Sequence, residues 1–145
     1  MNAIKTALLA STFLSLPFLA SAETHLYTWK VLRVIDGDTV EIEAPYLPAP
    51  LKPSLSIRVF GVDTPEKGFR AQCEDEANLG KKATEFTTAK VQNAADIKVS
   101  IVQWDKFGGR VLGDLMIDGH SLTEMLIEEG YARPYHGEKK QSWCE

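Results

Sequence analysis

Residues that build zinc sites are scarce in this 145-residue chain. There are two cysteines, Cys73 and Cys144, and three histidines, His25, His120 and His136, and no Cys-x-x-Cys pair joins them. Structural zinc sites need four such ligands, usually in closely spaced pairs. The sequence therefore excludes a zinc finger or another Cys/His metal centre.

Positive charge is also in short supply. The chain has 16 lysines and arginines against 20 aspartates and glutamates, which gives a net charge of −4. A protein that coats nucleic acid without sequence preference owes its affinity to an excess of basic residues over phosphates. That class is excluded, whereas an enzyme that meets phosphate locally is not. An excess of carboxylates also suits a metal site.

Long apolar runs are missing beyond the N-terminus. Residues 1–22 carry one early lysine, then an apolar stretch interrupted by serines and Pro17, then small residues up to Ala22. This is the pattern of a secretory signal, and the stretch is too short and interrupted to span a membrane. We expect cleavage after Ala22 and one exported domain, residues 23–145, that is periplasmic or secreted and not bound to a membrane.

The expected export bears on whether the two cysteines form a disulfide. In an oxidising compartment, two cysteines in one domain are most simply joined in a disulfide. We expect a bond between Cys73 and Cys144, which would tie the C-terminal tail to the middle of the chain. A pair of free buried thiols is the alternative.

The remaining pattern predicts a mainly β fold with helices. Alternating apolar residues predict five strands, at 26–35, 39–44, 55–62, 97–104 and 110–117. Helical spacing predicts a helix at 72–93 and a second at 121–130, the latter starting with a capping box. The proline-rich segment 44–53 predicts an irregular connection. Five strands with a helix between the third and fourth, and a C-terminal helix, favour a small closed Greek-key barrel.

Polar residues gather at the ends of the predicted strands, at Asp36 and Asp38, at Arg58, and in the segments 63–66 and 105–110. Clustered carboxylates offer the hard oxygen ligands that calcium prefers, and arginines match phosphate oxygens in pairs. Each feature also has an ordinary explanation, because Asp-Gly is a common hairpin turn and strand arginines often form surface ion pairs. The combination points to a phosphodiester site.

Four motifs together carry a family resemblance. The segments VIDGDTVEI, IRVFGVDTPE, DKFGGRVLGDLMIDG and LTEMLIEEGYARPY occur in this order over nearly all of the expected mature chain. In sequence and spacing they resemble the staphylococcal nuclease (thermonuclease) family. The resemblance implies a five-stranded OB-fold barrel with helices, and an endonuclease that cleaves DNA and RNA with calcium and leaves 3′-phosphates.

The same resemblance implies a calcium site. Asp38 and Asp63 correspond to the calcium carboxylates, and the carbonyl of Thr64 corresponds to a further ligand. Asp36 corresponds to the aspartate that stands behind these ligands in the same turn.

The resemblance also implies roles around the phosphate. Glu66 corresponds to the residue that activates or orients the attacking water, and Arg58 and Arg110 correspond to the phosphate-binding arginines. Lys106 and Tyr135 lie near positions that touch the nucleotide.

Two features depart from the family pattern. The turn before Arg110 is one glycine longer than the common form, so the loop must absorb a residue if Arg110 is to reach the site. The proline-rich segment 44–53 replaces a shorter connection. Either change would alter access or substrate preference without removing a catalytic residue type.

Two other functions fit parts of the sequence. The letters DGDTV also fit an aspartyl phosphatase of the haloacid dehalogenase type, but that chemistry needs a larger Rossmann-like sheet. A catalytically silent OB-fold module that binds nucleic acid would show lost carboxylates or arginines and a basic, aromatic groove. The sequence favours a monomeric, calcium-dependent endonuclease acting on DNA, RNA or both, with the silent module as the alternative.

Overall fold

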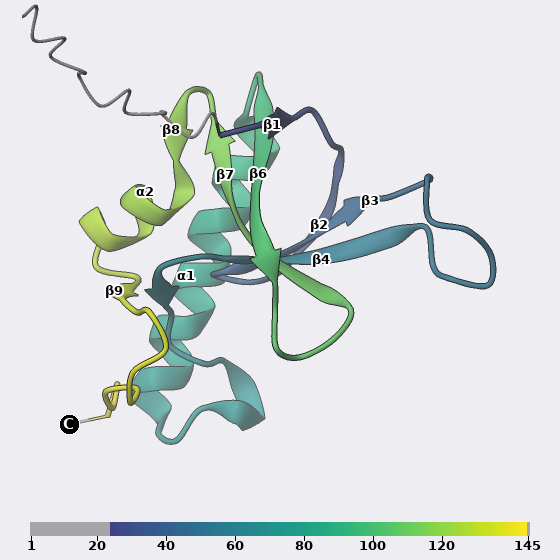
Figure 1. Cartoon of the computed structure of the whole chain (residues 1–145). Coiled ribbons are helices and arrows are strands. Elements are labelled where there is room, and N and C mark those ends of the chain that lie inside the picture. The colour runs from purple at the N-terminus through teal and green to yellow at the C-terminus, as the bar shows by residue number, and fades with distance from the viewer. Residues whose placement is uncertain (1–23, 145) are drawn as a thin grey trace, which may run out of the picture.

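A computed structural model describes residues 24–144, so the expected signal peptide lies outside the described residues. This part of the chain is mostly β with two α-helices, α1 (Glu74–Asn93) and α2 (Leu122–Glu128), and a short 3₁₀-helix, η1 (Gly68–Arg70). Figure 1 shows α1 packed behind the strands. Within residues 24–144, no helix combines the length and apolar character needed to cross a membrane.

Seven strands form one mixed sheet. Its path runs β1-β6-β7-β4-β3-β2, and β8 pairs with β7 outside that path. The neighbours β4 and β7 are parallel, and the other pairs are antiparallel. A separate two-stranded sheet joins β5 and β9. The bounds are β1 Leu26–Tyr27, β2 Val31–Asp36, β3 Thr39–Glu43, β4 Ser54–Val59, β5 Val62–Asp63, β6 Ile97–Trp104, β7 Arg110–Ile117, β8 His120–Ser121 and β9 Arg133–Pro134.

The strand predicted at 26–35 is divided in the structure. Its first part, β1, pairs with β6, and its second part, β2, pairs with β3. These are the two ends of the sheet order, so one chain segment supplies both edges. The closed five-stranded barrel is not confirmed, because the hydrogen bonds among residues 24–144 form an open path.

The core follows from the alternation of apolar residues. On β3 and β4, Val40, Ile42, Ile57 and Val59 are almost completely buried, and every second residue of β7 is buried. Leucines of α2 cover one end of this core. Period-2 burial on one face of each strand is what a sheet packed on a single side requires.

Both helices begin at side-chain caps. The hydroxyl of Ser121 accepts a hydrogen bond from the backbone N–H of Glu124 at 3.3 Å, as the capping box predicts. The sulfur of Cys73 accepts one from the backbone N–H of Glu76 at 3.4 Å. The two helices start at Glu74 and Leu122, within two residues of the starts predicted at 72 and 121.

The predicted irregular connection is also present. Between β3 and β4 the proline-rich residues 44–53 form no strand or helix, and Figure 1 shows this loop projecting from the body of the fold. Prolines explain the irregularity, because they remove backbone donors.

Candidate active site

The Asp-Gly-Asp turn is a hairpin between β2 and β3 that is held against α1. A Cβ on Gly37 would lie 2.8 Å from the Cβ of Ala83, closer than real Cβ contacts. Thr87 donates a hydrogen bond to the carbonyl of Gly37 at 2.6 Å. Glycine is therefore needed for close approach to the helix, which fixes the positions of Asp36 and Asp38 on either side.

Arg58 connects the two predicted calcium carboxylates. Its position on β4 is opposite Thr39 of β3, and its Nη1 lies 2.7 Å from Oδ2 of Asp38. Its Nη2 lies 3.8 Å from Oδ1 of Asp63 and donates to the carbonyl of Val62 at 3.4 Å. The guanidinium group therefore sits between two aspartates that are 3% and 5% exposed.

Asp36 and Glu66 are linked through the 3₁₀-helix. Arg70 Nη2 donates to Asp36 Oδ2 at 2.7 Å, and Arg70 Nε lies 3.3 Å from Glu66 Oε2. Lys67 Nζ lies 3.4 Å from Asp36 Oδ1. The hydrogen bond to Asp36 raises the pKa of Arg70 above its ordinary value. Asp36 therefore holds the side chain of Arg70 in position beside Glu66.

The backbone of Glu66 is fixed by α1. The buried carboxylate of Glu76 accepts hydrogen bonds from the N–H of Glu66 at 3.2 Å and from the N–H of Gln72 at 2.7 Å. Gly80 lets the helix approach so closely that a Cβ there would lie 2.3 Å from the carbonyl oxygen of Glu66. Sequence reasoning missed this role of Glu76, because nothing in the sequence separates it from its acidic neighbours.

The loop before Arg110 absorbs its additional glycine. Gly109 adopts a positive φ of 78°, a conformation that glycine reaches without strain. Arg110 donates from Nε to Asp105 Oδ2 at 2.7 Å, and Phe107 N–H donates to Asp105 Oδ1 at 3.3 Å. Burial acts to raise the pKa of Asp105, but these hydrogen bonds outweigh it, so the pKa is lowered from its ordinary value. An ionised carboxylate therefore holds the side chain of Arg110 in position.

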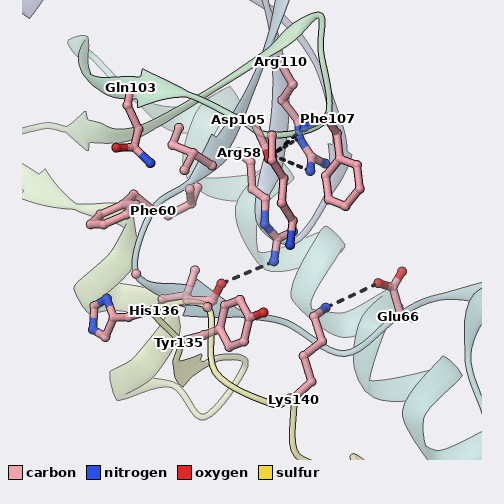
Figure 2. Close-up of a pocket in the computed structure, with 16 residues that line it drawn as sticks. Arg58, Phe60, Glu66, Gln103, Asp105, Phe107, Arg110, Tyr135, His136 and Lys140 are labelled. Carbon is pink, nitrogen blue, oxygen red and sulfur yellow. Dashed lines mark hydrogen bonds and ion pairs between the residues drawn. The ribbon is translucent and has the colours of Figure 1, made fainter.

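A pocket of about 490 Å³ is lined by the residues predicted to bind phosphate and to activate the attacking water. Arg58 comes from β4, Arg110 from β7, and Glu66 and Tyr135 from the loops after β5 and β9. Lys106 also lines this pocket. Figure 2 shows the side chains of Arg58, Glu66, Arg110 and Tyr135 around one space. Further lining residues include some that had no sequence signal, among them Phe60, Gln103, His136 and Lys140.

The predicted metal ligands lie beside this pocket. Asp63 and Thr64 line a second cavity of about 900 Å³, and Glu66 lines both cavities. Asp38 and Asp63 are nearly buried, and Oδ1 of Asp63 makes no hydrogen bond but lies within ion-pair distance of Lys140 and Arg58. A nearly buried carboxylate oxygen that attracts cations but receives no hydrogen bond fits a hard cation such as calcium.

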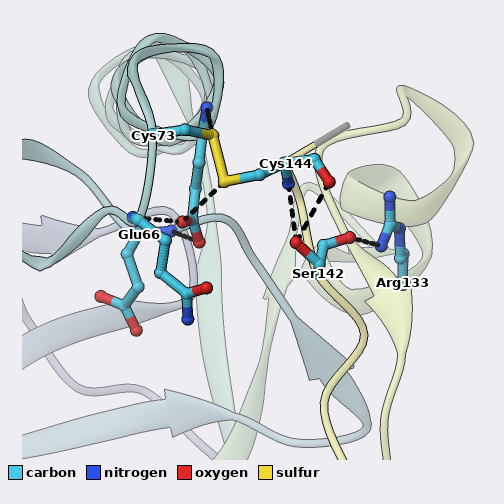
Figure 3. The surroundings of a disulfide bond; sticks show 7 residues. Glu66, Cys73, Arg133, Ser142 and Cys144 are labelled. Carbon is cyan, nitrogen blue, oxygen red and sulfur yellow. Dashed lines mark hydrogen bonds between the residues drawn. A yellow bond between two sulfur atoms is a disulfide. The ribbon is translucent and has the colours of Figure 1, made fainter.

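The two cysteines form a disulfide that joins the start of α1 to the C-terminal tail (Figure 3). Glu76 lies beside it, with Oε2 3.9 Å from the sulfur of Cys144. This Cys-Glu-Cys group resembles a metal cluster in its spacing, but bonded sulfurs are not thiolate ligands.

Comparison with known proteins assigns the chain to a family. A family model described as "Staphylococcal nuclease homologue" matches residues 56–143. The chain belongs to the staphylococcal nuclease family. It is 31% identical to the thermonuclease of Staphylococcus hyicus over 73% of this chain and 58% of that protein. It is 30% identical to endonuclease YhcR of Bacillus subtilis (strain 168), over 75% of this chain but 9% of that protein. It is 27% identical to an uncharacterized endonuclease of Escherichia coli, over 73% of this chain and 60% of that protein.

These family members are longer than the present chain. It spans about three fifths of the length of the thermonuclease and of the Escherichia coli endonuclease, and under a tenth of YhcR.

Proposed function

We propose that this chain is a calcium-dependent endonuclease that hydrolyses phosphodiester bonds of DNA, RNA or both. The observation that carries the proposal is the convergence of Arg58, Arg110 and Glu66 on one pocket, beside the nearly buried carboxylates of Asp38 and Asp63. The names of the family members support nuclease chemistry.

The calcium ion would be held by the carboxylates of Asp38 and Asp63 and by the carbonyl of Thr64. When bound, it supplies positive charge that stabilises the developing negative charge on the phosphate. Arg58 Nη1 already lies against Asp38, so it is placed to bind phosphate next to this site.

Glu66 would take the proton from the attacking water. Its carboxylate is 38% exposed and lines the pocket, so water reaches it, and its backbone is held by Glu76. Arg58 and Arg110 would bind the phosphate oxygens and stabilise the transition state, and Asp105 keeps Arg110 in place. We propose that cleavage leaves a 3′-phosphate, and that Lys106 and Tyr135 contact the nucleotide.

The closed five-stranded OB barrel and the export of the chain belong to the same proposal. One segment supplies both β1 and β2, which are the two edge strands of the sheet, and this return of one segment to both edges supports a barrel. The disulfide supports an oxidising compartment outside the cytoplasm, where we expect a monomer that starts at Glu23.

The test is digestion of single-stranded DNA, double-stranded DNA and RNA, each with calcium and with a calcium chelator. We expect cleavage of at least one substrate with calcium and none with chelator, and 3′-phosphate ends on the products. Tight binding of all three without cleavage would instead identify a silent binding module.

A further inference from the structure

The C-terminal tail, residues 135–144, is anchored at both ends beside the candidate active site. At its start, β9 pairs with β5, and the N–H of Tyr135 donates to the carbonyl of Gly61 at 2.8 Å. At its end, Cys144 is bonded to Cys73. The tail is therefore a closed loop rather than a free end.

Contacts within this loop fold it back onto the site. The guanidinium of Arg133 stacks on the ring of Trp143, 3.8 Å from its centroid, and donates to the carbonyl of Ser142 at 2.9 Å. The indole N–H of Trp143 donates to Oδ2 of Asp63 at 3.2 Å. Trp143 therefore ties the tail directly to a predicted calcium ligand.

The tail brings Lys140 into the pocket. Its Nζ lies 2.5 Å from Oδ1 of Asp63, in an ion pair without hydrogen-bond geometry, and 4.0 Å from Oε1 of Glu66. The ammonium also lies 5.8 Å from the ring centroid of Tyr135. Figure 2 shows Lys140 reaching from the tail toward Glu66. Lys140 lines both cavities, as Glu66 does.

Lys140 repeats the arrangement of the two arginines. Each of these three pocket cations makes its shortest ion pair with a nearly buried aspartate, whose side chain is at most 7% exposed, while the cation itself is more open. Arg58 pairs with Asp38, Arg110 with Asp105, and Lys140 with Asp63, which also lies 3.8 Å from Arg58. A cation held by a buried carboxylate at the wall of a pocket is preorganised to bind an anion there. An ammonium has three N–H donors, so pairing with Asp63 leaves donors for phosphate oxygens.

We propose that Lys140 is a third phosphate-binding residue of this site, positioned by the disulfide-anchored tail. The proposal rests on the proposed function, since it assigns to the same pocket one more contact with the substrate. It requires the tail to be tied down, because a lysine on a free chain end would lose the preorganisation.

Equilibrium binding of a fluorescent single-stranded DNA oligonucleotide tests the proposal, in chelator and over a range of salt concentrations. Lys140→Ala should weaken binding several-fold and reduce the slope of log affinity against log salt by about 0.7, the value for one phosphate contact on a single strand. Lys140→Arg should restore most of both quantities. The matched control is Lys139→Ala, because Lys139 is exposed on the same tail, lines the second cavity but not the 490 Å³ pocket, and makes no ion pair with any residue in 24–144.

The tether is tested by a double-mutant cycle. Replacing both cysteines by serine should weaken oligonucleotide binding about as much as Lys140→Ala, and adding Lys140→Ala to that protein should cause little further loss. Thermal unfolding of each variant establishes that it is folded at the assay temperature. Additive losses in the folded variants would contradict positioning by the tail.

Two results would overturn the role of Lys140 itself. One is a Lys140→Ala protein whose affinity and salt slope match those of Lys139→Ala. The other is a Lys140→Ala protein with unchanged oligonucleotide binding but tighter calorimetric calcium binding, which would make Lys140 a counter-ion of Asp63 only. Failure of the proposed nuclease function would give a different result. In that case the wild-type protein would bind the oligonucleotide but would not cleave it in calcium.

Discussion

Gly80→Ala tests whether α1 positions Glu66. Gly80 is buried within helix α1, where alanine ordinarily stabilises a helix by about 1 kcal/mol. Here the new Cβ would lie 2.3 Å from the carbonyl oxygen of Glu66 and 2.7 Å from that of Pro65, whereas ordinary contacts begin at 3.4 Å. The helix or the Glu66 segment must therefore move by about 1 Å, the difference between these distances.

The size of the effect follows from the atoms involved. Both neighbours of the new Cβ are backbone, so no rotamer change relieves the clash, and overpacking of this kind costs roughly 1–3 kcal/mol. The helix gain of about 1 kcal/mol offsets part of that cost, so we expect a net loss of up to about 2 kcal/mol. A displacement of about 1 Å at a catalytic group reduces the rate by on the order of 10²-fold.

The assay compares kcat at saturating calcium with the free energy of unfolding in urea. We expect Gly80→Ala to lower both kcat and the free energy of unfolding. Oligonucleotide binding in chelator should stay close to that of the wild type, because Arg58 and Arg110 lie on strands and not on the displaced segment. The control is Asn78→Ala, an exposed position of the same helix, which should keep kcat and gain a few tenths of a kcal/mol. A Gly80→Ala protein that is more stable and keeps wild-type kcat would refute the reasoning.

Three other residues give separate expectations. Arg110→Ala should lower the single-turnover rate far more than it weakens oligonucleotide binding; equal losses would limit Arg110 to binding. Asp63→Ala should weaken calorimetric calcium binding and raise the calcium needed for half-maximal activity; an unchanged affinity would remove Asp63 from the metal site. Because the pKa of Asp105 is lowered in the folded protein, its charge stabilises the fold fully above about pH 3.8, the ordinary pKa, and this contribution disappears as the pH falls through the lowered value. The difference in unfolding free energy between wild type and Asp105→Asn should shrink over that acid range, and a constant difference would contradict the linkage.

Local patterns predicted the parts of the fold that depend on neighbouring residues. Runs of apolar and β-branched residues identified β3, β4, β6 and β7, and the alternation is clearest in β7, where every second residue is buried. The cap at Ser121 identified the start of α2 because its hydrogen bond closes within one turn. The motif residues Arg58, Glu66 and Arg110 were found through the family resemblance, and the structure brings all three to one pocket.

Long-range contacts explain what the sequence did not reveal. The first predicted strand divides because Leu26 and Tyr27 pair with β6 rather than with β3. Gly80 has no special φ, so only the close approach of Glu66 explains it. Lys140 carries no motif, and it reaches the pocket from a tail whose end is joined to α1 by a disulfide across 71 residues.

The most direct test of the proposed chemistry is the single-turnover cleavage rate of Glu66→Gln at saturating calcium. Glutamine keeps the shape and hydrogen-bonding capacity of the side chain but removes its charge and basicity. We expect a rate reduced on the order of 10²-fold or more, the usual scale for a lost general base, with calcium and oligonucleotide binding close to those of the wild type. A Glu66→Gln protein that cleaves at the wild-type rate would contradict the assignment of Glu66 to water activation.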